Sequence, residues 1–206
     1  MDMDSKISKA VELIAQLSVD KASQVLSKLV RCGARIVLEK AYLADLSDAT
    51  ARVNAEETQI EVIGSMVDML GDAPFKFLFY ADAPSCLILT DLILRREVGL
   101  VKEFDIYVRS AIQEIGNIMA SAICSVFSTD FEIAMKPTPP KVIHDFVGTV
   151  FQEFVMGTAS ERDEVLIIES TFHIISHDIK CSMFILPFPG SDKTINYICN
   201  TRFKGD

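Results

Sequence analysis

The chain has 206 residues, of which 50% are hydrophobic, and it carries 20 Lys and Arg against 29 Asp and Glu, a formal net charge of −9. This length suits one domain or two tightly fused halves, with enough apolar residues for a full core. Because no basic run offsets the negative charge, the composition argues against a nucleic-acid groove and against an anionic membrane surface as partners.

The N-terminus, the most apolar segment and the cysteines indicate the compartment of the protein. The N-terminus, Met1 to Ser5, has no basic region ahead of an apolar one, so we expect no signal peptide. The most apolar window, 85–94, contains Asp91 and is shorter than the roughly 20 residues of a membrane-spanning helix. Since neither a signal peptide nor a membrane-spanning helix is expected, we expect a cytoplasmic protein. The cysteines are dispersed and form no CxxC pair, which predicts reduced core thiols and neither disulfides nor a zinc site. They are Cys32, Cys86, Cys124, Cys181 and Cys199.

The first half of the chain is predicted to form a helix and then strands. Residues 5–31 have apolar residues at helical spacing, and 18–20 is a candidate break between two helical segments. The elements expected next are a strand at 35–43, a loop or irregular helix at 44–57, strands at 58–70 and 75–80 around a turn at 71–74, and a helix at 83–95. Phe75, Phe77 and Phe79 alternate and are expected to line a strand face in the core, with a partner-binding edge as the alternative.

The second half repeats this order. The expected elements are a helix at 104–128, a strand at 131–136 that ends at the prolines of 137–140, a helix at 141–156, a loop at 157–163, strands at 164–175 and 180–186 joined at 176–178, and a short helix at 191–202. An internal duplication predicts a pseudo-twofold fold: one domain, 1–206, made of two halves, about 5–96 and 97–203. The predicted class is an α+β sandwich, a mainly antiparallel sheet with the two long helices on one face.

The helix at 104–128 carries the most informative pattern of the chain. Its polar side bears Ser110, Glu114, Asn117 and Ser121, at about 100° per residue. Its apolar side bears Ile112, Ile115, Met119, Ala122 and Val126. A carboxylate and a carboxamide thus lie one turn apart on a helix whose opposite side is expected to pack in the core. By itself, a Glu-x-x-Asn pair is usually a solvated helix face.

A longer pattern surrounds this pair. The spacing Ser-x3-Glu-x2-Asn-x22-Pro, from Ser110 through Glu114 and Asn117 to Pro140, resembles the signature of the CheC/CheX/FliY phosphatases of bacterial and archaeal chemotaxis. The segments that resemble the flanking strands and helix of this family are 71–80, 92–99, 163–172 and 183–189. The resemblance covers about residues 13–190 and implies a CheC-like fold.

The resemblance also implies an activity, the hydrolysis of the aspartyl phosphate of a phosphorylated CheY-type response regulator. It implies that Asn117 orients the attacking water, that Glu114 pairs with the active-site lysine of the regulator, and that Ser110 and Pro140 support the motif. Such chemistry is mostly positioning and charge stabilisation, which a neutral carboxamide suits. No cofactor of the chain's own is implied, because Mg²⁺ is expected on the phosphorylated partner.

The first half departs from this signature. Leu13 and Gln16 stand where Glu and Asn would be expected, and the strand that follows lacks the matching proline. Leucine cannot pair with a lysine, and glutamine is one methylene too long to place the same water. We therefore expect one working site per chain.

Other interpretations remain open. The main rival is a weakly catalytic or non-catalytic CheC-like binding module for the deamidase CheD or for a flagellar switch, although the chain ends soon after the fold and is expected to lack the C-terminal switch domain of FliM or FliY. His173, His177 and Cys181 could be metal ligands, and His144 with Asp145 an acid-base pair, but ordinary surface positions are favoured for both sets. We expect no metal site, and the sequence leaves the oligomeric state open.

Overall fold

The computed structural model describes residues 3–30, 34–49, 51, 60–156, 164–174 and 177–188. The elements of the first half are α1 (Met3–Val30), β1 (Ala34–Asp45), β2 (Glu61–Gly71), β3 (Phe75–Asp82) and α3 (Ala83–Ile93). The elements of the second half are α4 (Ile106–Asp130), β4 (Met135–Pro137), β5 (Lys141–Phe146), α5 (Val147–Val155), β6 (Glu164–Ile174) and β7 (His177–Pro187). A short helical segment, 46–49, follows β1.

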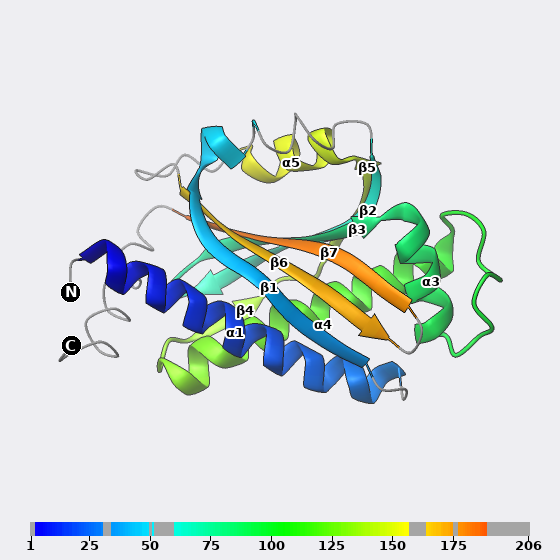
Figure 1. The fold of residues 1–206 in the computed structure, drawn as a ribbon, viewed down its shortest axis with the longest axis horizontal. Coiled ribbons are helices and arrows are strands. Elements are labelled where there is room, and N and C mark those ends of the chain that lie inside the picture. Colours follow the sequence, from blue (N-terminus) through cyan, green and yellow to red (C-terminus); the bar gives the residue numbers. More distant parts are fainter. Residues whose placement is uncertain are drawn as a thin grey trace.

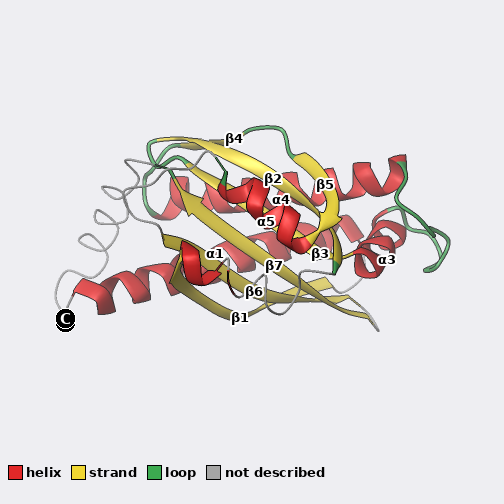
Figure 2. Ribbon diagram, turned by 90° about the horizontal axis from the view of Figure 1, so that it is seen from above, coloured by secondary structure: helices red, strands yellow, loops and turns green. Residues whose placement is uncertain are grey.

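The described strands form one seven-stranded antiparallel sheet in the order β1-β6-β7-β3-β2-β4, with β5 also paired to β2. The strands β4 and β5 share the same edge, because β4 pairs with Met69–Gly71 and β5 with Glu61–Met66. Their separation leaves Thr138, Pro139 and Pro140 between them. Figure 2 shows this edge beside β2, and β1 lies at the opposite edge.

Helices cover both faces of the sheet. The helices α1, α3 and α4 lie on one face, with α1 and α4 packed together, and α5 lies on the other (Figure 1). The larger core fills the space between the sheet and the three helices and includes Phe75, Phe77 and Phe79, each at most 3% exposed. The smaller core, around Phe151 and Phe154, lies under α5. The predicted antiparallel sandwich with two long helices on one face is confirmed, as is the core position of the three phenylalanines.

Several local predictions need correction. The candidate break at 18–20 is wrong, because α1 is continuous: Val19 is buried, and Asp20 accepts a hydrogen bond from Gln16 within the helix. The strand predicted at 131–136 is short, since only 135–137 pairs with β2. The predicted loop at 157–163 and helix at 191–202 lie outside the described residues.

The helix predicted at 141–156 is wrong for its first six residues and confirmed for 147–155. Residues 141–146 form β5, and only 147–155 is helical. The apolar residues Val142, Ile143 and Phe146 have helical spacing, but the segment follows Pro140 and pairs along its whole length with β2. This pairing overrides the local pattern.

The two halves correspond residue by residue over their first elements. The strand β1 covers 34–45, and 101 positions later β4 and β5 cover 135–137 and 141–146. With the same offset of 101 residues, each buried residue described on α1 corresponds to a buried residue on α4. The pairs are Ala10 with Ala111, Val11 with Ile112, Ile14 with Ile115, Ala15 with Gly116, Ser18 with Met119, Val19 with Ala120, Ala22 with Ile123, and Leu26 with Phe127.

Candidate functional site

The helix α4 is held at its start and along its buried side. Its N-cap residue, Asp105, accepts hydrogen bonds from the backbone N–H groups of Tyr107 and Val108, both at 2.9 Å, which satisfies donors that a helix start leaves free. The apolar side predicted from the sequence is buried, with Ile112 at 0% and Ile115 at 1% exposure. The remaining predicted members, Met119, Ala122 and Val126, are at most 3% exposed.

The polar side of α4 faces outward. Ser110, Glu114, Asn117 and Ser121 are all exposed. Within the part of the chain that the structure describes, no hydrogen bond or ion pair engages the side chains of Glu114 and Asn117. A carboxylate and a carboxamide are therefore available, one turn apart, on a helix that the core holds rigidly.

Pro140 lies under this helix. A Cβ atom built on Gly116 would be 3.4 Å from the Cβ of Pro140 and 2.1 Å from the Oγ of Ser65 on β2. The structure thus brings Pro140 next to the helix that carries Glu114 and Asn117, although 22 residues separate it from Asn117 in the sequence. The sequence pattern offered no sign of Ser65, because its contact with α4 depends on how the helix crosses the sheet.

The corresponding positions of α1 differ in chemistry. The 101-residue offset places Leu13 at the position of Glu114, Gln16 at that of Asn117 and Glu39 at that of Pro140. The Nε2 of Gln16 donates to Asp20 Oδ1 at 2.9 Å, so this amide is already engaged. Glu39 lies at the bulge of β1, at the place where β4 and β5 are interrupted in the second half.

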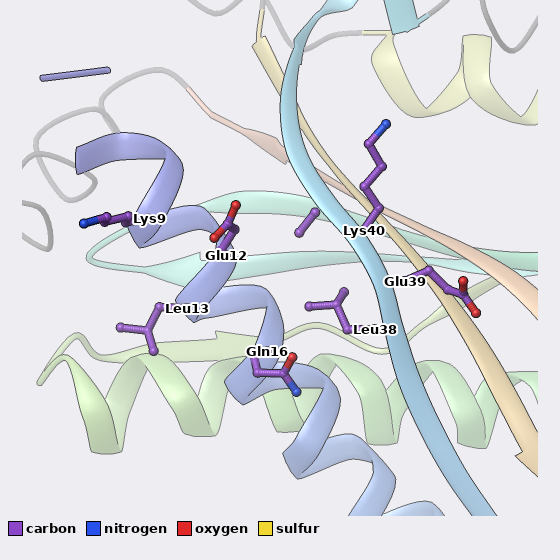
Figure 3. Close-up of a pocket in the computed structure, with 8 residues that line it drawn as sticks. Lys9, Glu12, Leu13, Gln16, Leu38, Glu39 and Lys40 are labelled. Atoms are coloured by element: carbon purple, nitrogen blue, oxygen red, sulfur yellow. The ribbon is translucent and has the colours of Figure 1, made fainter. Parts of the chain in front are cut away.

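A groove of about 630 Å³ lies between α1 and β1 beside these residues. Figure 3 shows Glu12, Leu13 and Gln16 of α1 and Leu38 of β1 around it, whereas Glu39 extends away from α1. The Oε1 of Glu39 accepts a hydrogen bond from Thr171 Oγ1 at 2.8 Å. The first half therefore presents no exposed, unengaged pair of carboxylate and carboxamide at this face.

The other candidate residues do not converge. The Nε2 of His144 lies 2.7 Å from Glu61 Oε1, and its ring packs on Phe104, so its partner is Glu61 and not Asp145. His173 lies in β6 and His177 begins β7. Within the described residues, no three potential metal ligands form a group, and no helix is long and apolar enough to span a membrane.

The motif segment matches a known family. The model of the CheC-like family matches residues 108–144, a stretch that contains Ser110, Glu114, Asn117 and Pro140. The CheY-P phosphatase CheC of Bacillus subtilis (strain 168) is 28% identical over 80 residues, which are 38% of this chain and 38% of the relative's own length. The FliY structure from Thermotoga maritima superposes with a TM-score of 0.78 over 98% of this chain and 100% of that chain, at 16% identity. The chain is therefore similar to the CheC-like family over residues 108–144 and shares the fold of FliY.

Other solved structures share the fold of this chain. A chain of the CheX–CheY–BeF3–Mg²⁺ complex from Borrelia burgdorferi gives a TM-score of 0.52 at 15% identity, over 84% of this chain and 96% of that chain. A chain of the FliG–FliM complex from H. pylori gives a TM-score of 0.66 at 11% identity, over 97% of this chain and 100% of that chain. The predicted resemblance to the CheC/CheX/FliY family is confirmed.

Proposed function

We propose that this CheC-like protein dephosphorylates a phosphorylated CheY-type response regulator. The observation that carries the proposal is the exposed pair of Glu114 and Asn117, unengaged within the described residues, on a helix fixed by the core and inside the segment that the family model matches. The name of the Bacillus relative, a CheY-P phosphatase, supports this class of partner. Such a partner places the protein in the cytoplasm.

In this proposal the substrate is an aspartyl phosphate. A water oxygen attacks phosphorus, the bond from phosphorus to the aspartyl oxygen breaks, and the products are the free carboxylate, inorganic phosphate and a proton. Placing the water in line and stabilising the charge supply most of the rate gain, so the helper protein need not provide a nucleophile. The carboxamide of Asn117 suits this task, because it offers a donor and an acceptor and carries no charge that would repel the phosphoryl oxygens.

Glu114 has a different role in the proposal. Its carboxylate, one helical turn before Asn117, pairs with a lysine beside the phosphorylated aspartate and fixes the docking of α4. The pair would be partly shielded from water in the complex, where a charge-assisted contact is stronger than on a free surface. Ser110, one turn further back on the same exposed side, and Pro140, under the helix, support the motif. Any Mg²⁺ is bound by the regulator.

The second candidate function is that of a binding module. It is favoured by the first half, where Leu13 and Gln16 show that a motif face can be lost while the fold is kept. The FliM middle domain from H. pylori has the same fold. In that case the protein would dock CheD or a flagellar switch component without accelerating hydrolysis.

Phosphate release separates the two candidates. A CheY-type regulator is charged with acetyl phosphate, freed of the excess, and followed for inorganic phosphate with and without this protein. The phosphatase proposal expects release to accelerate in proportion to catalytic amounts of the protein. Saturable binding of the regulator or of CheD without acceleration would instead support the binding module.

A further inference from the structure

The helix α4 approaches β2 closely at Gly116, the residue before Asn117. A Cβ atom built on Gly116 would lie 2.1 Å from Ser65 Oγ and 2.8 Å from Ser65 Cβ, where no side-chain atom fits. The Cβ of Pro140 would lie at 3.4 Å, close to an ordinary contact. The helix therefore reaches this depth only with a glycine at 116 and a small residue at 65.

Ser65 is an unusual residue for its surroundings. It is 0% exposed, on the face of β2 that carries the core residues Ile63 and Val67. Among the described residues its hydroxyl has no hydrogen-bond partner. A buried hydroxyl without a partner costs stability, so stability alone favours alanine here. Departures of this kind are expected where a residue serves a functional site.

The first half lacks this arrangement. Ala15 stands at the position of Gly116, and Glu39 at that of Pro140. Ser65 pairs with Val142, whose counterpart Ala41 pairs with Ile168, so an isoleucine occupies the position of Ser65. The glycine, the serine and the proline thus occur together in the half that carries the Glu-x-x-Asn pair, and none of the three stands at the corresponding position of the other half.

We propose that Gly116, Ser65 and Pro140 form a seat that sets the depth and rotation of α4 and thereby aims Asn117 and Glu114 at the phosphoryl group of the partner. This inference rests on the proposed phosphatase function. Gly116 and Ser65 are positioning residues, because they act through the helix and do not touch the substrate. Misplacing a catalytic group by about 1 Å can cost on the order of 100-fold in rate, so small shifts of the helix matter.

Exchanging the side-chain sizes at positions 116 and 65 tests whether this contact positions α4. Gly116→Ala introduces the clash, and Ser65→Gly removes the side chain under the helix and loosens the seat without a clash. Each single substitution is expected to lower kcat for regulator dephosphorylation by about tenfold, with KM within about twofold. The double variant, Gly116→Ala with Ser65→Gly, is expected to recover kcat to within about twofold, because the added methyl group fills the space that the serine leaves.

The matched control is Ala15→Gly, which changes the corresponding residue of α1 and should leave kcat unchanged. A residue with a purely structural role would alter the melting temperature but not kcat per folded molecule. The side-chain amide resonance of Asn117 gives a readout that does not need activity: it should shift in both single variants and return in the double variant. If wild-type protein released no phosphate, the proposed function would fail, and this resonance would still decide on the seat.

Three results would contradict the proposal that Gly116, Ser65 and Pro140 position α4. The first is full kcat in Ser65→Gly, a variant that only removes atoms and is expected to fold. The second is a folded double variant that stays as slow as the single variants. The third is an Asn117 resonance that does not move in either single variant.

Discussion

Glu114 and Asn117 share one face of α4, but the proposed mechanism gives them separable effects. Glu114→Lys places a positive charge opposite the regulator's lysine and should weaken docking. We expect KM for the phosphorylated regulator to rise by about tenfold, with kcat within about twofold, in steady-state phosphate release. Glu12→Lys, the same charge change at an exposed position of α1, is the control and should leave both constants unchanged. A fall in kcat at unchanged KM would contradict a docking role for Glu114.

The buried thiol of Cys86 is expected to lower the free energy of unfolding at alkaline pH. It is 0% exposed, and burial, assisted by the negative charge of Asp82, raises the pKa of its thiol from 9.0 to about 12. The folded state therefore favours the protonated thiol, so its contribution is complete below pH 9 and is lost as the pH rises towards 12. Between those values we expect the free energy of unfolding to fall by about 1.4 kcal/mol per pH unit from this group alone.

Urea unfolding of wild type and Cys86→Ala at a series of pH values measures this effect. The variant loses packing at all pH values, so the quantity to compare is the slope of unfolding free energy against pH above 9. A shallower slope in Cys86→Ala is expected. Equal slopes would show that other groups cause the alkaline loss.

At the scale of elements, Asp91 of α3 holds the connection to the motif helix. Its side chain is 0% exposed and accepts hydrogen bonds from the backbone N–H groups of Gly99, Leu100 and Val101 at 2.8 to 3.3 Å. Asp91→Asn removes the charge and one acceptor oxygen, and we expect it to lower the free energy of unfolding by about 2–3 kcal/mol. Asp68→Asn, an exposed change on β2, should stay within about 0.5 kcal/mol. Equal effects in urea unfolding would contradict the role of Asp91.

The elements also show what the sequence can predict. The motif helix is predicted at 104–128 and lies at 106–130, because its apolar stripe is a local signal. Glu114 and Asn117 could be placed on one face for the same reason. The strand β5 could not be recognised, since its pairing with β2 is a tertiary contact. Ser65 could not be found either, because the sequence does not show where α4 crosses β2.

At the scale of the whole molecule, we propose that any Mg²⁺ used in the reaction is bound by the regulator. The described residues contain no group of three potential metal ligands. Calorimetric titration of the isolated protein with Mg²⁺ or Zn²⁺ should therefore show no stoichiometric site in the micromolar range. The regulator alone, titrated with Mg²⁺, is the positive control. A micromolar site on the isolated protein would refute this prediction.

Among the described residues, the two halves correspond in α1 and β1 against α4, β4 and β5, but the outward faces of the two long helices differ. Every buried residue described on α1 corresponds to a buried residue of α4, whereas α1 carries Leu13 and Gln16 at the positions where α4 carries Glu114 and Asn117. The scaffold could be inferred from the repeated order of elements. The proposed asymmetry of function depends on Glu114 and Asn117, exposed residues that contribute little to the fold.

The central claim is that catalysis belongs to the α4 face alone. The most direct measurement is phosphate release from a phosphorylated CheY-type regulator with wild type, Asn117→Ala and Gln16→Ala, the last being the matched change on α1. We expect a loss of kcat of about tenfold or more in Asn117→Ala and a change within about twofold in Gln16→Ala, with wild-type melting temperatures in both. Full activity in Asn117→Ala, or lost activity in a normally melting Gln16→Ala, would contradict it.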